Sequence, residues 1–163
     1  MAYCFQKMIQ TDAEQIAGWH YDGIYSFYDA SSDAEDLAEL LNPELRGDQY
    51  FSVYQNNRLA GYFTYNWNDE RQSIVIGLGM HPDLTGKGLG GPFLEAGLEY
   101  GQKLFMPARR FELSVAAFNK RAMKVYRKAG FSIRKRSFVR TNGGRYEFVH
   151  MDKQVKTSVE PEL

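Results

Sequence analysis

The chain has 163 residues, with 20 Lys or Arg against 20 Asp or Glu, so its formal net charge is zero. This length is typical of one domain, and the balanced charge gives no indication of a nucleic acid or an anionic membrane as partner. The single cysteine, Cys4, excludes an internal disulfide and fits a reducing compartment. There is neither a signal-peptide pattern nor a run of about 18 apolar residues. We therefore expect a cytoplasmic protein without a membrane partner.

The first third of the chain predicts short elements around a segment rich in aromatic residues. Thr11 or Asp12 suits the start of a helix, and Ser32 with Glu35 forms a capping-box pattern for a second one. Residues 19–28 hold many aromatic side chains without helical or strand periodicity, which indicates a loop that packs its own rings or walls a pocket. The expected ranges are a strand at 3–9, helices at 11–19 and 32–41, and strands at 50–55 and 59–67 that turn at Asn56-Asn57.

The rest of the chain alternates strands with helices and ends on a hairpin. The expected ranges are strands at 73–80 and 110–116, a helix at 92–104, a helix that begins at Asn119, and strands at 131–140 and 145–151. Asn142-Gly143, between the last two strands, is the pair that a type I′ turn favours. This order predicts an α/β fold in which helices cover the faces of a mixed sheet. We expect residues 1–151 to form one domain and the polar residues 152–163 to be a disordered tail.

Residues 85–91, Thr-Gly-Lys-Gly-Leu-Gly-Gly, lie between a predicted strand and a predicted helix. Glycines let backbone N–H groups approach a ligand closely, and a helix N-terminus favours an anion. The segment therefore predicts a site for a phosphate-bearing cofactor. Gly86, Gly88 and Gly91 also satisfy the dinucleotide pattern G-x-G-x-x-G, but too few residues remain for the strand–helix units which that fold requires. A Walker loop is excluded, because Lys87 is followed by glycine.

A second motif occupies residues 119–131, Asn-Lys-Arg-Ala-Met-Lys-Val-Tyr-Arg-Lys-Ala-Gly-Phe. Asn119 suits a helix N-cap and Gly130 the left-handed position after a helix. The motif resembles the Asn-x-x-Ala-x-x-x-Tyr-x-x-x-Gly-Phe pattern of the GNAT superfamily of N-acetyltransferases. The glycine segment, as Thr85-x-x-Gly88-x-Gly90, resembles that family's acetyl-coenzyme A loop, Gln/Arg-x-x-Gly-x-Gly/Ala. The resemblance covers residues 72–133, and the two motifs together make it specific.

The resemblance implies a GNAT-like acyl-coenzyme A N-acyltransferase fold, with a central mixed, mostly antiparallel sheet flanked by helices. It also implies acetyl-coenzyme A as co-substrate and no metal. The residues expected to contact this cofactor are Leu78, Met80, Thr85, Gly86, Lys87, Gly88, Leu89, Gly90, Gly91 and Asn119. Thr85 stands where the family has Arg or Gln, so we expect weaker cofactor binding. Gly77 and Gly79 share one strand face and indicate either a close approach or a β-bulge.

Tyr126 is the expected catalytic acid, because the resemblance places the tyrosine that protonates the departing thiolate at this position. From the helix pattern alone it is a core aromatic residue. Many relatives carry a Glu in the strand before the loop, whereas residues 73–80 contain no acid, so the amine is expected to lose its proton through water. Other candidate bases are more ordinary as turn, surface or packing residues; they are His20, His81, Asp83 and Glu112.

The acceptor is expected to be an amine of a small molecule or a peptide, bound by a protein that is a monomer or a homodimer. An aromatic wall of Trp19, Tyr25, Tyr28 and Trp67 suits an apolar or cationic amine, although ordinary core packing explains such residues as well. Two other functions stay open. One is a non-catalytic acyl-coenzyme A sensor or protein-interaction module on the same fold, and the other is a nucleotide-binding oxidoreductase.

Overall fold

The computed structural model of the protein describes residues 2–105 and 107–155. Its strands are β1 (Cys4–Lys7), β2 (Tyr50–Gln55), β3 (Arg58–Asn68), β4 (Ser73–Met80), β5 (Arg110–Ala116), β6 (Ser132–Thr141) and β7 (Gly144–Gln154). Its α-helices are α1 (Gln10–Ala17), α2 (Ala34–Leu41), α3 (Pro43–Arg46), α4 (Gly90–Leu104) and α5 (Lys120–Lys128). Short 3-10 helices occupy η1 (Gly23–Tyr28), η2 (Ala30–Ser32) and η3 (Pro82–Leu84).

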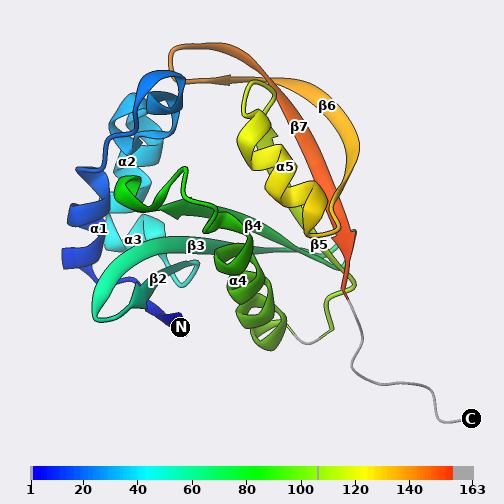
Figure 1. Cartoon of the computed structure of the whole chain (residues 1–163), viewed down its shortest axis with the longest axis horizontal. Coiled ribbons are helices and arrows are strands. Elements are labelled where there is room, and N and C mark those ends of the chain that lie inside the picture. The colour runs from blue at the N-terminus through cyan, green and yellow to red at the C-terminus, as the bar shows by residue number, and fades with distance from the viewer. Residues whose placement is uncertain (1, 106, 156–163) are drawn as a thin grey trace, which may run out of the picture.

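The strands form a seven-stranded sheet in the order β1-β2-β3-β4-β5-β7-β6 (Figure 1). Neighbouring strands are antiparallel except β4 and β5, which run parallel. This confirms the predicted mixed, mostly antiparallel sheet. The parallel pairing joins only Ser73–Val75 to Arg110–Glu112. Beyond it β4 continues to Met80 beside β3, while β5 continues beside β7, so the sheet is split between the ends of β4 and β5.

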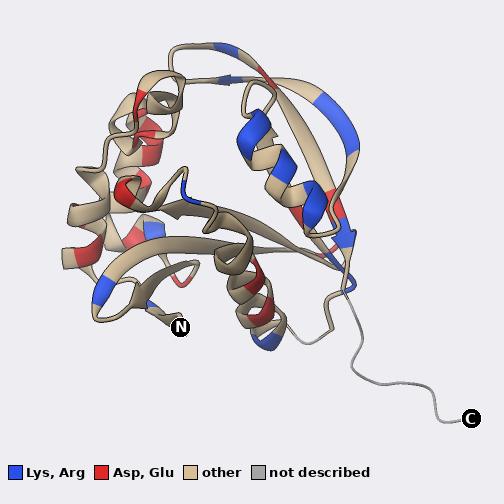
Figure 2. Ribbon diagram, in the orientation of Figure 1, with Lys and Arg blue, Asp and Glu red and all other residues tan. Residues whose placement is uncertain are grey.

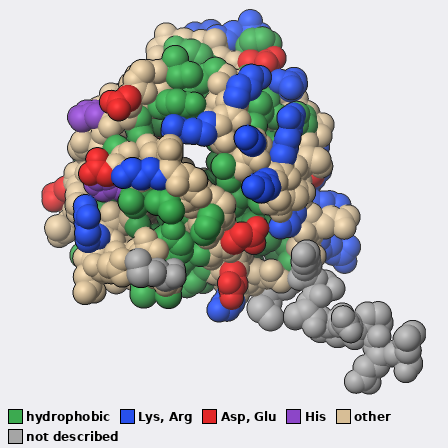
Figure 3. Space-filling model, viewed as in Figure 1, with side chains coloured by type: hydrophobic (Ala, Val, Ile, Leu, Met, Phe, Trp, Pro, Cys, Tyr) green, Lys and Arg blue, Asp and Glu red, His purple; other side chains and the backbone are tan. Residues whose placement is uncertain are grey.

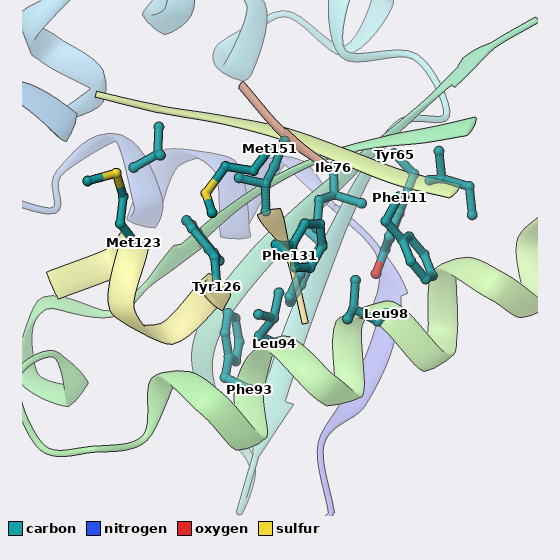
Figure 4. Close-up of a cluster of buried hydrophobic side chains, with 14 of the residues drawn as sticks. Tyr65, Ile76, Phe93, Leu94, Leu98, Phe111, Met123, Tyr126, Phe131 and Met151 are labelled. Atoms are coloured by element: carbon teal, nitrogen blue, oxygen red, sulfur yellow. The ribbon is translucent and has the colours of Figure 1, made fainter. Parts of the chain in front are cut away.

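The two faces of the sheet bury different hydrophobic clusters. Phe63 and Tyr65 of β3 belong to the larger cluster, with side chains from α4 and α5 (Figure 4). Tyr62 packs against the smaller cluster, which includes Ile16 of α1 and Leu40 of α2. Because alternate residues of a strand point to opposite faces, α4 and α5 cover one face and α1 and α2 the other.

Glycines in α4 and β4 leave room for side chains of β3. A Cβ on Gly97 of α4 would lie 2.0 Å from the Phe63 ring, so only glycine lets the helix sit this close to β3. On the other face, a Cβ on Gly79 would lie 2.5 Å from the Tyr62 ring, and one on Gly77 equally close to Thr64. The register between β3 and β4 is continuous, so these strand glycines accommodate side chains of β3 and do not mark a β-bulge.

Most predicted turns and caps are confirmed, with two exceptions at helix starts. Asn142 and Gly143 both have positive φ, as a type I′ turn requires. However, α2 is capped by Asp33, not Ser32: its carboxylate accepts from the N–H groups of Glu35 and Asp36, both at 3.0 Å. The cap of α1 is Ile9, so the predicted caps of that helix, Thr11 and Asp12, are wrong.

One helix was not predicted, and the predicted boundary of the C-terminal tail is wrong. The short helix α3 was not expected from the sequence. Strand β7 extends to Gln154, so the start of the predicted tail at 152–163 is strand, while residues 156–163 lie outside the described residues. Within the described ranges, no helix is both long and apolar enough to cross a membrane.

Candidate functional site

Among the described residues, the split between β4 and β5 leaves one edge of β4 without a strand partner beyond Val75. The N–H of His81, just after β4, donates to the Ala60 carbonyl of β3 at 2.8 Å. Successive strand residues point their backbone polar groups to opposite edges, so those of Met80 and Leu78 point into the split. The Met80 carbonyl accordingly accepts a hydrogen bond from the Tyr21 hydroxyl, at 2.7 Å, from outside the sheet. The edge at Leu78 and Met80 therefore offers backbone donors to a bound chain.

A cavity of about 1090 Å³ occupies this split and reaches both faces of the sheet. This volume lies just above the usual range of about 300–1,000 Å³ for small-molecule and cofactor sites. The space-filling view shows the molecule hollowed near its centre, with Lys and Arg side chains along the side that carries α5 (Figure 3). Of the predicted cofactor residues, the structure brings into the lining Leu78, Met80, Thr85, Gly86, Gly88, Leu89, Gly90, Gly91 and Asn119, but not Lys87.

The glycine segment wraps the N-terminus of α4 at one end of the cavity. Gly86 and Gly88 have φ of 73° and 74°, a conformation that side-chain-bearing residues rarely adopt. Apart from its chain neighbours, no atom of the described residues lies within 4 Å of where a Cβ on Gly88 would stand, so the space beside it is open. The Thr85 hydroxyl donates to the Pro82 carbonyl at 2.8 Å and is therefore used within its own turn. The Thr85 hydroxyl therefore does not replace the long donor that the family has at this position, and the backbone N–H groups of the loop are the donors left for a ligand.

Helix α5 places cationic side chains beside this loop, which the sequence analysis missed. Arg121, Lys124 and Lys128 line the cavity, and the Arg121 guanidinium lies 3.5 Å from where a Cβ on Gly86 would stand. Their spacing of three and four residues puts them on one side of the helix, and this pattern was available in the sequence. Open N–H groups, the positive end of α4 and these cations make this end of the cavity suited to phosphates.

Tyr126 lies on α5 where the cavity passes through the split sheet. It is 9% exposed, lines the cavity and packs in the larger cluster, its ring 6.1 Å from that of Phe131. Burial, followed by the nearby Tyr28 and Tyr62 hydroxyls, raises its pKa above the usual value for tyrosine. The hydroxyl is therefore protonated at neutral pH, so it can serve as a proton donor but not as a base. The helix that carries it starts where predicted: the Asn119 side chain accepts from the Ala122 N–H at 3.0 Å.

The aromatic segment crosses the cavity and contacts α5. The Tyr28 hydroxyl accepts from the Ala116 N–H at 3.3 Å and from Nδ2 of Asn119 at 3.2 Å. The Tyr25 ring lies under the Arg121 guanidinium, 4.1 Å from centroid to Cζ. Both tyrosines line the cavity, as do Tyr21 and Phe27.

The two predicted tryptophans do not reach the cavity. Trp19 is 6% exposed in the smaller cluster, where its ring lies 4.9 Å from that of His81. Trp67 stacks on Phe105, at 5.6 Å and 15°, near the far end of β3. Neither belongs to the cavity lining, so the expectation that they wall the acceptor site is wrong. Both are packing residues, which was the ordinary alternative.

Two of the residues weighed as bases, Glu112 and His81, are engaged elsewhere. Glu112 forms ion pairs with Arg71 at 2.6 Å and Arg134 at 3.7 Å at the closed end of the split, and it is not in the cavity lining. Burial raises the pKa of this carboxyl, but hydrogen bonding from Ser73 and the Arg71 charge outweigh it, so the net shift is downward. The His81 ring nitrogen accepts from the Asp83 N–H at 3.0 Å, which shapes the turn.

One titratable group near the cavity was not considered from the sequence. The Ser114 side chain lines the cavity, and its hydroxyl lies 2.7 Å from Nδ1 of His150. Burial and the charges of Lys135 and Arg134 lower the pKa of His150, so the ring is neutral at pH 7. A neutral imidazole can accept a proton relayed through Ser114. Within the described residues, no group of three or more His, Cys, Asp or Glu side chains is arranged to hold a metal ion.

Comparison with known proteins agrees with this geometry. The family model described as Acetyltransferase (GNAT) family matches residues 13–131. A mycothiol acetyltransferase from Corynebacterium aurimucosum is 34% identical over 89 residues, which are 53% of this chain and only 29% of that protein. The chain therefore matches less than a third of the length of this curated relative.

Two solved structures are similar over nearly their whole length. One is a chimera of the spermidine N-acetyltransferase SpeG from Vibrio cholerae with hSSAT, with a TM-score of 0.74 at 18% identity, covering 94% of this chain and 96% of that one. The other is a GNAT family acetyltransferase from Bacillus anthracis, with a TM-score of 0.70 at 17% identity, covering 94% and 95%. At this identity they establish a shared fold. Since the family model spans well over half of the chain, the protein belongs to the GNAT family of acetyltransferases.

Proposed function

We propose that the protein transfers the acetyl group of acetyl-coenzyme A directly to a primary amine, in a ternary complex. The observation that carries this proposal is the meeting of three features in one cavity: the glycine loop, the free edge of β4 and the buried Tyr126 hydroxyl. Family membership supports acetyl transfer. We also propose that the chain up to the end of β7 at Gln154 acts as one domain in the cytoplasm, and that the protein is a monomer or a homodimer.

In this proposal the cofactor lies along the split sheet. Its phosphates bind the N–H groups of the glycine loop, with Arg121 and Lys124 providing positive charge. Its pantetheine arm pairs with the free edge of β4 at Leu78 and Met80, as an added strand would. A backbone N–H of this edge then polarises the thioester carbonyl, because a fixed donor stabilises the oxyanion that develops there.

The chemical step conserves every proton. The neutral amine attacks the thioester carbon, and a C–N bond forms while the carbonyl oxygen gains negative charge. The oxyanion then collapses, the C–S bond breaks and its electron pair stays on sulfur, which takes the Tyr126 proton. The tyrosine regains a proton from the new ammonium through water. The Ser114–His150 pair, with its 2.7 Å contact, is a second route for removing that proton.

Kinetics with acetyl-coenzyme A and a panel of primary amines tests this proposal. Release of free coenzyme A thiol that depends on both substrates, with intersecting double-reciprocal lines, is the expected result. Parallel lines would instead indicate an acyl-enzyme, for which Ser114 is the hydroxyl nucleophile with a neighbouring base. Spermidine is the natural first amine, because the Vibrio cholerae protein of similar fold is named for it.

The alternative is a non-catalytic acyl-coenzyme A sensor or protein-interaction module. It is favoured by two departures from the family pattern: Thr85 uses its hydroxyl within the turn, and β4 carries no acid. Calorimetry separates the alternatives. Tight acetyl-coenzyme A binding without thiol release for any amine supports the sensor, whereas NADH binding in the absence of coenzyme A binding would support an oxidoreductase.

Tyr25 gives a prediction about cofactor binding that the sequence did not suggest. Its ring supports the Arg121 guanidinium beside the glycine loop, and a partly exposed cation–π contact contributes about 0.5–1 kcal/mol. Tyr25→Ala should therefore raise the KM for acetyl-coenzyme A by roughly two- to fivefold, while Tyr25→Phe, which keeps the ring, should not. An increase confined to the amine KM would assign Tyr25 to the acceptor wall alone, as predicted from the sequence.

A further inference from the structure

The zero net charge conceals a separation of charge across the cavity. Residues 1–72 contain 12 Asp or Glu and 4 Lys or Arg, whereas residues 73–163 contain 8 and 16. Acidic residues lie along α2 and basic residues along α5, on opposite sides of the molecule's centre (Figure 2). The cavity is lined from both sides, by Asp29 and Asp36 on one and by the α5 cations on the other. Its α2 end therefore attracts positive charge.

Asp36 is the carboxylate at this end that lacks a cation. It lies in the first turn of α2 and lines the cavity, and no ion pair of its side chain occurs among the described residues. Asp36 is exposed to solvent by its accessible surface, yet desolvation by the surrounding residues, then the charges of Asp33, Glu39 and Glu35, raise its pKa. The neighbouring Asp29, by contrast, pairs with His20 at 2.9 Å and accepts the Tyr21 N–H. A bound cation would relieve the repulsion at Asp36.

Tyrosine rings line the cavity along with Asp36. Tyr62 lies opposite Gly79, where the missing side chain leaves room for its ring, and Tyr50 joins it in the lining. Burial and the charge of Asp36 raise the pKa of Tyr62 to about 12. Both phenols therefore stay neutral at physiological pH and present electron-rich ring faces. A carboxylate beside such rings is the combination that binds an alkylammonium group.

The tip of the β6–β7 hairpin borders the α2 end of the cavity. Thr141 Oγ1 and the Asn142 N–H both donate to Asp33 at 3.0 Å, and Nδ2 of Asn142 donates to the Phe27 carbonyl at 2.6 Å. These bonds join the hairpin tip, whose Thr141 and Asn142 line the cavity, to the start of α2 and to η1; Figure 1 shows the hairpin tip reaching toward α2. A roof of this kind admits a small flexible molecule more readily than a folded protein segment.

We propose that the acceptor is a small aliphatic diamine or polyamine, whose second ammonium group is bound by Asp36 and the rings of Tyr62 and Tyr50. This rests on the proposed function. One amine faces the thioester at the edge of β4, while the other remains protonated at the acidic end. Asp36 is thus a specificity-determining residue, and a monoamine lacks the group that it binds.

The test compares putrescine with butylamine, which has the same carbon chain without the second ammonium. We expect the wild-type kcat/KM for putrescine to exceed that for butylamine by about tenfold or more, the usual worth of a charge-assisted hydrogen bond. In Asp36→Asn this ratio should fall by about tenfold. Glu35→Gln is the matched control, because it removes the same charge from the same turn of α2 but lies outside the cavity lining, and it should keep the preference.

Calorimetric titration with putrescine makes the result independent of turnover. Wild-type protein should bind putrescine at least tenfold more tightly than Asp36→Asn does, with thermal unfolding showing that both are folded. Equal kcat/KM for the two amines, or equal putrescine binding by wild type and Asp36→Asn, would overturn the proposal. If no amine releases coenzyme A, the proposed function fails, but the putrescine titration still decides whether Asp36 binds a cation.

Discussion

Replacing Gly88 with Val is expected to abolish detectable acetyl-coenzyme A binding while the protein still folds. Gly88 has φ of 74°, which a β-branched residue does not adopt without strain, so the loop must change its backbone. The added side chain would also fill the open space beside the loop, where its Cβ would have only its chain neighbours within 4 Å in the described part of the chain. The changed backbone moves the N–H donors of the loop, and the added side chain occupies the space in which a phosphate would bind. Calorimetry should show a loss of affinity of at least 100-fold, about 2.7 kcal/mol.

Gly47→Val is the matched control for this variant. Gly47 follows α3, has φ of 55° and likewise has no atom within 4 Å of a Cβ, but it is not in the cavity lining. It should share the cost of a strained backbone, on the order of 1–3 kcal/mol, and keep acetyl-coenzyme A affinity. If Gly88→Val binds as well as wild type, or if both variants lose binding alike, the loop is not the phosphate site.

Local sequence signals predicted helix starts and turns correctly where a short motif favours one backbone conformation. Asn119 caps α5 through its side chain, and Asn142-Gly143 adopts positive φ at both positions. The start of α2 was misplaced by one residue because Ser32 and Asp33 are both good caps. Tertiary contacts favour Asp33 as the cap, since its carboxylate also accepts hydrogen bonds from Thr141 and Asn142 of the distant hairpin. No local pattern contains that information.

The functional site divides in the same way. The glycine loop and Tyr126 line the cavity, and they could be singled out from the sequence because their spacing is local and resembles the family's motifs; their roles in binding and catalysis are proposals. Which aromatic residues face the cavity could be predicted only in part, because burial in a core and exposure to a cleft demand the same side chains; Tyr25 and Tyr28 do line it. Trp19 and Trp67 are packed, whereas Tyr62 and Tyr50, which were not singled out, line the cavity. Asp36 was likewise missed, since an acidic residue in a first helical turn is ordinary.

Tyr126→Phe is expected to lower kcat by roughly 10²–10⁴, the usual range for loss of general acid catalysis. The substitution keeps the ring in the larger cluster and removes only the proton that the departing sulfur would take. Acetyl-coenzyme A affinity should change little, because one neutral hydrogen bond contributes about 0.5–1.5 kcal/mol. Tyr65→Phe is the control: it also removes a buried hydroxyl, which donates to the Gly97 carbonyl at 2.6 Å, but it lies outside the cavity lining. It should lower stability and leave kcat unchanged.

The pH profile gives a second readout for Tyr126. Burial raises its pKa above the ordinary tyrosine value, so the hydroxyl keeps its proton throughout the range in which the protein can be assayed. Wild-type activity should therefore rise with pH as the acceptor amine loses its proton, without a fall at high pH that is due to Tyr126. Because a phenol of raised pKa is a weak acid, it gives up its proton only when the sulfur carries nearly a full negative charge. An acyl donor with a more acidic thiol than coenzyme A should then lose less from Tyr126→Phe. A Phe variant that keeps near-normal kcat with acetyl-coenzyme A would instead make Tyr126 a packing residue.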